Sequence, residues 1–218
     1  MIKQSISGKV FLMVPKNKTD QKRSRDPAAK RALILAAALK EFARHGFAGA
    51  RTDQIATVAN VSVGTIFKIF PDKKILANAV FENCLQRIRS RLEPVLKSTL
   101  DPHDVFKAMW DVYIQLIFQE TDCLFFYEYQ PNSLFLDPKN QLALSMLREQ
   151  LLKWIKFNQI NGVLKKTSSE SLRAIAIGSL MRILREYVDG NSTPTKLQLT
   201  ELRDLVWEAI SSNTERPC

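Results

Sequence analysis

The chain has 218 residues, of which 45% are hydrophobic and 25% are charged, and its formal net charge is +10. This size and composition are ordinary for a soluble protein of one or two domains. The three cysteines are odd in number and far apart, which argues against a disulfide framework and fits a reducing cytoplasm. No apolar run approaches the length of a membrane span, so we expect a cytoplasmic protein without a membrane partner.

The positive charge is concentrated near the N-terminus. Residues 1–72 hold 13 lysines and arginines against 5 acidic residues, a net charge of +8, whereas residues 73–218 hold 19 against 17, a net charge of +2. This asymmetry favours either attraction to nucleic-acid phosphates or a solvated basic tail. Residues 1–26 are predicted to form a flexible basic arm that serves solubility or contacts a nucleic-acid backbone or minor groove. Either Met1 or Met13 is a plausible start.

The first predicted helix spans residues 27–45. Pro27 suits its first turn, and Gly46 follows it as a terminating residue. Apolar side chains recur at the spacing i, i+3, i+4, i+7 and define one face of this helix: Leu35, Ala38, Leu39 and Phe42. We expect this face to pack on the helices that follow.

Two short helices joined by a tight turn come next. Thr52 suits the N-cap of the first, and Asn60 at the turn is one of the few residue types besides glycine that tolerate the left-handed region. Ser62 can cap a second helix over residues 63–70, which Pro71 ends. A helix, a tight turn and a second helix form the geometry that places one helix in the major groove of DNA.

These two helices belong to a wider pattern that keeps register from residue 34 to residue 73. It consists of Ile34-Leu35, Ala37-Ala38, Phe42, Gly46-Phe47, Thr52, Ile55-Ala56, Ala59-Asn60-Val61-Ser62, Gly64-Thr65-Ile66-Phe67, Phe70 and Lys73. With these residues the segment resembles the N-terminal domain of the TetR family of bacterial transcriptional regulators. Three positions depart from the family pattern. Asn60 replaces the usual turn glycine, Phe67 replaces a tyrosine whose hydroxyl contacts phosphate, and Ile69 replaces a frequent histidine or tyrosine.

The resemblance implies an all-α fold with two domains. Residues 27–73 would form an N-terminal three-helix helix-turn-helix domain, and residues 74–218 a C-terminal helical bundle for effector binding and dimerisation. The resemblance also implies DNA contacts from Thr52, Ser62, Val63, Gly64, Thr65, Phe67, Lys68 and Lys73. Among these we expect Lys73 at a phosphate, with Thr65 and Lys68 reaching base edges or nearby phosphates.

Helical periodicity and turn signals predict five more helices after the helix-turn-helix. Asp72 can cap a long helix over residues 73–92, which Glu93-Pro94 should weaken or kink. The other predicted elements are helices over residues 102–119, 139–160, 169–188 and 196–211, and a short aromatic segment over residues 123–129.

Aromatic residues concentrate in the middle of the C-terminal half, where the family binds its effectors. For any one of them an ordinary place in the core is the alternative. The predicted effector-binding residues are Trp110, Tyr113, Phe126, Tyr129 and Trp154, with Glu128 as a further polar candidate. No cluster of charged side chains is evident in this stretch, so we expect a small, mostly apolar effector.

The last two predicted helices resemble, by position and pattern, the pair that forms a four-helix dimer interface in the family. Gly178 lies in the middle of the first, where glycine costs about 1 kcal/mol relative to alanine, so a packing reason is expected. Ala174 and Gly178 are four residues apart and would let another helix approach closely. Together with Met181 they form the predicted dimer interface.

No catalytic constellation is evident in the sequence. It contains no glycine-rich phosphate loop, no nucleophile elbow and no cysteine–histidine cluster with metal-binding spacing, so we expect no enzyme, cofactor or metal. We predict a homodimeric regulator, a repressor, that a small molecule releases from a palindromic DNA operator. Two alternatives stay open. A ligand-independent DNA-binding protein with an architectural or division-linked role would have a full, dry core, and an enzyme would need a buried cluster of titratable groups.

Overall fold

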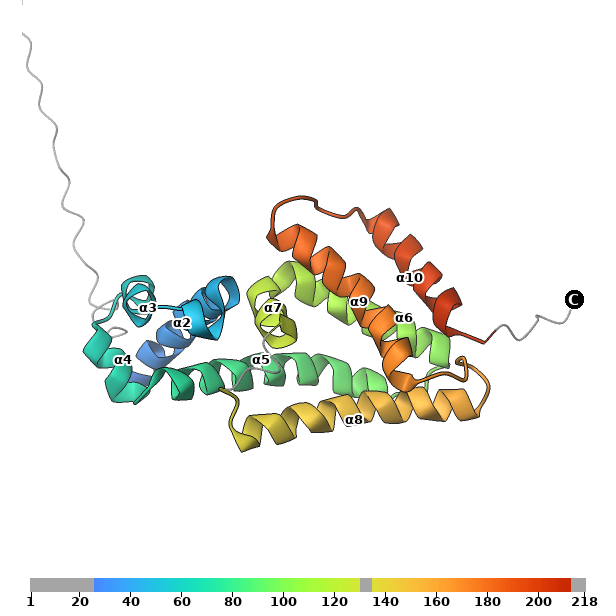
Figure 1. Cartoon of the computed structure of the whole chain (residues 1–218), viewed down its shortest axis with the longest axis horizontal. Coiled ribbons are helices and arrows are strands. Elements are labelled where there is room, and N and C mark those ends of the chain that lie inside the picture. The colour runs from blue at the N-terminus through green and yellow to red at the C-terminus, as the bar shows by residue number, and fades with distance from the viewer. Residues whose placement is uncertain (1–25, 130–134, 213–218) are drawn as a thin grey trace, which may run out of the picture.

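The computed structural model describes residues 26–129 and 135–212, and every regular element within these ranges is an α-helix (Figure 1). The helices are α2 (Pro27–Gly49), α3 (Thr52–Ala59), α4 (Val63–Ile69), α5 (Lys73–Leu96), α6 (Pro102–Gln119), α7 (Thr121–Tyr129), α8 (Pro138–Ile160), α9 (Ser169–Val188) and α10 (Lys196–Ile210). The prediction of an all-α fold is confirmed. The predicted basic arm up to residue 25, with both candidate start residues, lies outside the described residues.

The helices α2, α3 and α4 form a group at one end of the molecule, at the left of Figure 1. Asp26 caps α2, because its carboxylate accepts a hydrogen bond of 2.9 Å from the backbone N–H of Ala28. Gly46 has a φ of 65°, which interrupts the helical backbone near the predicted end. The side chains of Ile34 and Phe42 in α2 are fully buried in the core of the protein.

The turn between α3 and α4 has the predicted local chemistry, except at its first cap. Asn60 adopts the left-handed conformation with a φ of 54°, and the Ser62 hydroxyl accepts a hydrogen bond of 3.1 Å from the backbone N–H of Thr65. The prediction that Thr52 caps α3 is wrong. Arg51 occupies the N-cap position, and Thr52 is the first residue inside the helix. The backbone N–H of Arg51 donates instead to the Glu41 carboxylate of α2.

The helix α5 is longer than predicted and reaches Leu96, with Pro94 inside it. A proline removes one backbone donor and leaves the carbonyl four residues earlier without its helical partner. That carbonyl belongs to Ser90, an exposed residue, so water can reach it. Leu92 is buried and Leu96 is half-buried, so packing of this last turn offsets the cost of the proline.

The helix α5 runs along most of the molecule and connects its two ends, with α8 lying beside it (Figure 1). A buried amide pair joins these helices. The Asn78 amide nitrogen donates to the backbone carbonyl of Phe135 at 2.8 Å, and the Asn78 amide oxygen accepts from the side chain of Asn140 at 2.9 Å. The backbone N–H of Asp137 also donates to that oxygen. Because all these groups are paired, the polar contact is compatible with burial.

A cluster of five phenylalanines joins the N-terminal helices to the rest of the protein. Phe42 of α2 stacks on Phe47 and on Phe126 of α7, with ring centroids 6.2 and 5.7 Å apart. Phe81 of α5 and Phe135 complete the cluster, and both contact Phe126. We call Phe42, Phe47, Phe81, Phe126 and Phe135 the aromatic junction. Aromatic contacts of this kind exceed the stabilisation expected from burial alone by about 0.5–1.5 kcal/mol per pair.

Candidate functional site

The short helix α4 presents most of the residues predicted to contact DNA. Ser62, Val63, Gly64, Phe67 and Lys68 are exposed on or beside it, and Thr65 is half-buried. Ile66 on the opposite face is buried and anchors the helix to the N-terminal core. The hydroxyls of Ser62 and Thr65 lie 2.9 Å apart and share a hydrogen bond at the start of α4. The fold therefore exposes to solvent a face of α4 that carries both polar and apolar side chains.

Lys73 has internal partners in this structure. Its ammonium donates to the backbone carbonyls of Ala48 and Ala50, at 3.2 and 2.5 Å, and lies 5.2 Å from the ring centroid of Phe47. These contacts connect the start of α5 to the end of α2. The phosphate contact predicted for Lys73 stays a prediction, and it requires the ammonium to share or exchange these partners.

Most of the N-terminal charge excess lies outside the described residues. Residues 1–25 hold seven lysines and arginines and one aspartate, so they carry +6 of the +8 counted for residues 1–72. Within the described part, Arg51 is exposed and forms an ion pair of 2.6 Å with Asp53, which holds the pKa of that carboxyl below its ordinary value. The surface of α4 itself contributes one cation, Lys68.

The C-terminal helices enclose a cavity of about 90 Å³. Residues from α5 through α10 line it, and most of them are apolar. Three of the five predicted effector-binding residues are among them: Trp110, Tyr113 and Trp154. Trp110 is buried, and its indole N–H has no hydrogen-bond partner among the described residues. The cavity is smaller than the roughly 300–1,000 Å³ typical of ligand sites, so a bound molecule would have to displace its walls.

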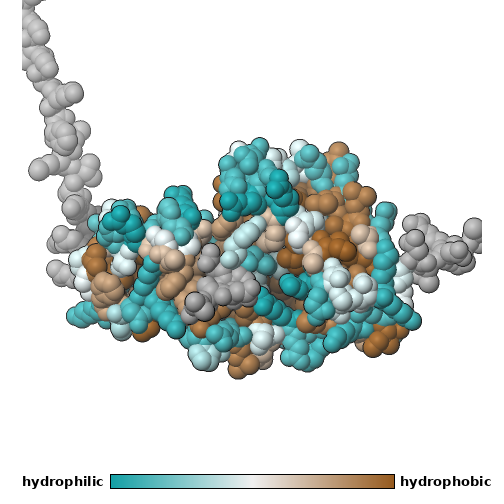
Figure 2. Space-filling model, in the orientation of Figure 1, coloured by the Kyte–Doolittle hydropathy of each residue, from teal (hydrophilic) through white to brown (hydrophobic). Residues whose placement is uncertain are grey.

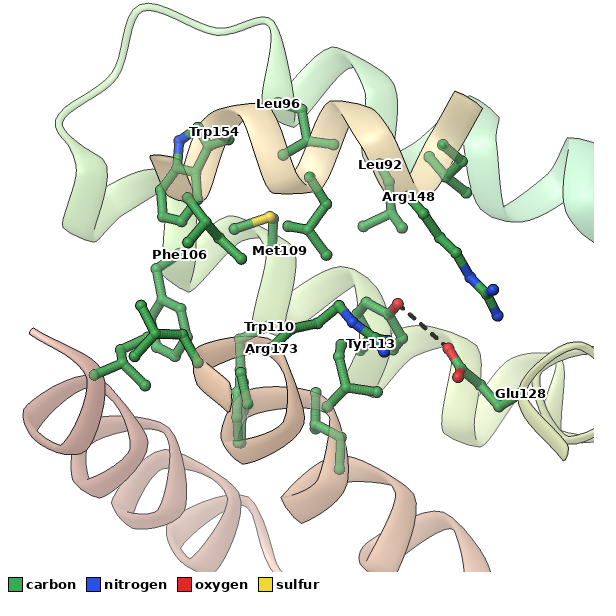
Figure 3. A pocket seen from close by; sticks show the side chains of 18 of the residues that line it. Leu92, Leu96, Phe106, Met109, Trp110, Tyr113, Glu128, Arg148, Trp154 and Arg173 are labelled. Carbon is green, nitrogen blue, oxygen red and sulfur yellow. Dashed lines mark hydrogen bonds between the residues drawn. The ribbon is translucent and has the colours of Figure 1, made fainter. Parts of the chain in front are cut away.

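One end of the cavity is charged (Figure 3). Glu128 of α7 accepts a hydrogen bond of 3.5 Å from the Tyr113 hydroxyl, and Arg148 of α8 and Arg173 of α9 also line the wall. Figure 3 shows Trp154 and Phe106 at the other end. The aromatic stretch itself contains no such cluster, and α8 and α9 supply the two arginines, so the wall is not uniformly apolar as the expectation of a mostly apolar effector assumes.

Burial raises the pKa of the Glu128 carboxyl to about 7. Removal of water from the carboxylate penalises its charged form more than the positive charges of Arg173 and Arg148 and the hydrogen bond from Tyr113 stabilise it. The same removal of water raises the pKa of the Tyr113 phenol, and Glu128 adds to this effect. Glu128 therefore changes its charge near neutral pH.

Two predicted effector-binding residues do not line this cavity. Phe126 is fully buried in the aromatic junction and packs on Phe42. Tyr129 is 42% exposed, stacks on Phe125, and donates its hydroxyl to the backbone carbonyl of Met181. In this structure α7 turns these two side chains toward other helices, so their role in effector binding stays a prediction that the cavity does not support. Glu128, Arg148 and Arg173 replace them in the cavity wall.

The helix α9 leaves an apolar face without cover in the single subunit. Ala174 and Gly178 are exposed on it, Ile175 is 43% exposed, and Met181 is half-buried against the core. A Cβ atom at Gly178 would have no neighbour within 4 Å. The glycine therefore has no packing role inside the subunit. Figure 2 shows hydrophobic surface gathered over α9 and α10, and α10 contributes the exposed residue Leu205.

Two other kinds of site are not found in the described ranges. These ranges contain no group of three or more histidine, cysteine or acidic side chains that could hold a metal ion. No helix within them combines the length and the apolar character needed to cross a membrane.

Comparisons with known proteins agree with this architecture. The family model for bacterial regulatory proteins of the tetR family matches residues 34–80, and that for the tetracyclin repressor-like C-terminal domain matches residues 81–212. The crystal structure of a TetR family transcription regulator from Marinobacter aquaeolei superposes with a TM-score of 0.72 at 17% identity, covering 90% of this chain and 100% of that one.

Two sequence relatives are transcriptional regulators by name. The uncharacterized HTH-type transcriptional regulator YhgD of Bacillus subtilis is 27% identical over 135 residues, which span 62% of this chain and 69% of that protein. The HTH-type transcriptional regulator RutR of Escherichia coli is 46% identical over 68 residues, which span 31% of this chain and 32% of that protein. With both family models matched in order over residues 34–212, the chain belongs to the TetR family of bacterial regulatory proteins.

Proposed function

We propose that this protein is a cytoplasmic, homodimeric repressor that binds a palindromic operator through α4 and leaves it when a small effector enters the cavity. The carrying observation is the outward face of α4, fixed by the Ser62 cap at one end and by buried Ile66 behind it. In this proposal residues 27–73 bind DNA. Residues 74–218 bind the effector and dimerise, and residues 1–26 add charge.

The chemistry of α4 suits a major groove. Lys68 is exposed and can donate to guanine edges or phosphates, while exposed Val63 and Phe67 offer apolar contacts to thymine methyl groups. Phe67 has no hydroxyl for a phosphate, so more of the backbone affinity must come from lysines, arginines and backbone N–H groups. In a dimer, the two copies of α4 should lie about 34–36 Å apart to enter successive major grooves.

The uncovered face of α9 supports dimerisation. Ala174 and Gly178 give a strip without large side chains, and a partner helix could approach the backbone there. A contact of this kind would bury Ile175 and the other exposed apolar residues of this face. The placement of Ala174, Gly178 and Met181 in the interface is part of this proposal.

Two helices can carry the effect of a ligand to the DNA-binding helices. Leu92 and Leu96 of α5 line the cavity, and the other end of α5 holds α2 through Lys73. Tyr127 and Glu128 of α7 line the cavity as well, and Phe126, which precedes them, packs on Phe42 of α2. A ligand releases DNA only if it binds the non-binding arrangement more tightly, and tenfold weaker DNA binding needs about 1.4 kcal/mol of coupling.

The cavity also bears on the ligand-independent alternative. An architectural or division-linked DNA-binding protein has no need of an internal space with charged walls, and such space reduces stability. The cavity of about 90 Å³ and its three charged side chains therefore favour an effector.

The test begins with DNA selection from a random pool by the full-length dimer, followed by mobility shifts on the enriched sequence. We expect a palindrome, with affinity that falls steeply between about 50 and 200 mM salt. Lys68→Ala should change the preferred bases, whereas Lys156→Ala, an exposed lysine on α8, should leave affinity and sequence unchanged. Enrichment of no sequence, or equal effects of the two substitutions, would contradict the proposed function.

A further inference from the structure

Two arginines in the cavity wall have no counter-ion in contact. Neither Arg148 nor Arg173 forms a hydrogen bond or an ion pair with any residue in the described ranges, although both line the cavity and are only partly exposed. The partly buried arginines of α5 differ from these two, since Arg89 pairs with Glu93 at 2.7 Å and Arg91 pairs with Glu120. An unpaired guanidinium beside an apolar wall is costly, and a bound anion would offset that cost.

The charge balance at this end of the cavity is positive in either state of Glu128. With the carboxyl ionised, the two arginines and Glu128 sum to +1, and with the carboxyl neutral they sum to +2. A cationic ligand would therefore meet net repulsion, and a neutral one would leave the guanidinium groups unpaired. A ligand with one negative charge balances the net charge of +1 that this end has when Glu128 is ionised. A doubly charged phosphate would exceed that net charge.

The cavity is also polarised along its length. Figure 3 shows Arg148, Tyr113 and Glu128 at one end, and Trp154 with Phe106 at the other, with Met109, Leu92 and Leu96 between them. A molecule that fills such a space has an apolar body and one polar end. The planar, forked guanidinium group matches the two oxygens of a carboxylate.

We propose that the effector is a small amphiphilic carboxylate whose head group lies between Arg148 and Arg173 and whose apolar body reaches toward Trp154. This inference rests on the proposed function, because it names the chemical class of the effector in the same cavity. The Tyr113 hydroxyl, which now donates to Glu128, is a further donor within reach of this end. The head group gives specificity, and the apolar body pushes the walls formed by α5 and α7.

The experiment uses n-alkyl carboxylates of eight to twelve carbons as probes, with the alcohol, amine and phosphate monoester of each length. Trp110 and Trp154 line the cavity, so their fluorescence reports binding to the full-length protein, and calorimetry gives an independent affinity. We expect the carboxylate to bind about tenfold or more tightly than each of the other three head groups. In Arg148→Gln/Arg173→Gln this preference should fall to about twofold or less, while Lys156→Gln on α8 should retain it.

Other outcomes overturn the inference. The carboxylate preference is refuted if the alcohol or amine binds as tightly, if the phosphate ester binds best, if no probe binds, or if the double variant keeps the preference. Melting curves confirm that the double variant is folded before its affinities are compared. If the carboxylate preference is refuted, the protein can still select a DNA palindrome, so the proposed repressor function is tested separately. A carboxylate that binds with the expected preference but does not release DNA supports the head-group assignment and removes its role as effector.

Discussion

The substitution Glu128→Gln should stabilise the protein above neutral pH and leave its stability almost unchanged at acid pH. The carboxyl of Glu128 has its pKa raised from an ordinary value of 4.5 to about 7 by burial. A carboxyl with a raised folded-state pKa favours the folded protein most when it is protonated. Its contribution is therefore fully present below pH 4.5 and is lost as the pH rises through about 7.

The size of the effect follows from the same two values. Raising a carboxyl pKa from 4.5 to about 7 corresponds to about 3 kcal/mol of unfolding free energy between the low-pH and high-pH limits. A glutamine keeps the shape and one hydrogen-bonding oxygen but cannot ionise. The stability of Glu128→Gln relative to wild type should thus rise across this window and level off at about 3 kcal/mol above pH 7.

Urea unfolding followed by helical circular dichroism, at several pH values between 4 and 8 and at one protein concentration, measures this difference. A fixed concentration matters because dimerisation adds to apparent stability. Other carboxyls with shifted pKa values, such as Glu93, cancel when variant and wild type are compared. Glu201→Gln, an exposed glutamate on α10, serves as the control and should show a flat difference. A flat difference for Glu128→Gln as well would refute the argument from burial.

Two further substitutions and one deletion test the other surfaces. Lys73→Ala should lower the unfolding free energy by about 1–3 kcal/mol, because the contacts with Ala48 and Ala50 are lost. It should also reduce the salt slope of DNA binding by about one. An unchanged melting curve would contradict the stabilising role of these contacts. Gly178→Leu should yield folded monomers in sedimentation, because the side chain has space inside the subunit but not in the proposed dimer seam, and a wild-type dimer would place Gly178 elsewhere. Deletion of residues 1–25 should reduce the salt slope by about two or more if this +6 segment contacts DNA, and an unchanged slope would assign it to solubility.

The local elements could be predicted because their signals lie within a few residues of one another. The bounds predicted for α6 and α9 agree with the structure, since the apolar periodicity is strong and a capping residue precedes each helix. Asp101 caps the first and Ser168 the second. The continuation of α5 past Pro94 could not be predicted in this way. It depends on the burial of its last turn by helices that are distant in sequence.

The cavity wall was predicted only in part, because the faces of α7 cannot be read from its sequence. Five consecutive residues of this helix, Cys123–Tyr127, are buried. A helix whose buried residues are consecutive has no narrow apolar stripe, so its sequence carries no periodic signal that separates cavity residues from packing residues. The sequence alone therefore does not distinguish Phe126 and Tyr129 from Trp110.

The two arginines did leave a signal in the sequence. Arg148 follows Leu144 by four residues and precedes Leu151 by three, so it falls within the apolar stripe of α8. Arg173 precedes Ile177 of α9 by four residues, so it also lies beside an apolar position of its helix. A charge within an apolar stripe indicates a buried partner or a ligand. Which of the two applies is decided only when packing brings the helices together.

The order of residues on α7 suggests how occupancy of the cavity could reach α4. Phe126 packs on α2, while Tyr127 and Glu128, the next residues in the chain, line the cavity. Successive residues of a helix point about 100° apart, so α7 contacts the cavity and the N-terminal helices on adjoining faces. A ligand that enlarges a cavity of about 90 Å³ must move at least one wall. If α7 moves, Phe126 must shift against Phe42, and α2 carries that displacement to α3 through their packed interface. A displacement of α5 would instead reach the end of α2 through the contacts of Lys73 with Ala48 and Ala50. The aromatic junction is therefore the element through which we expect ligand binding and DNA binding to exclude each other.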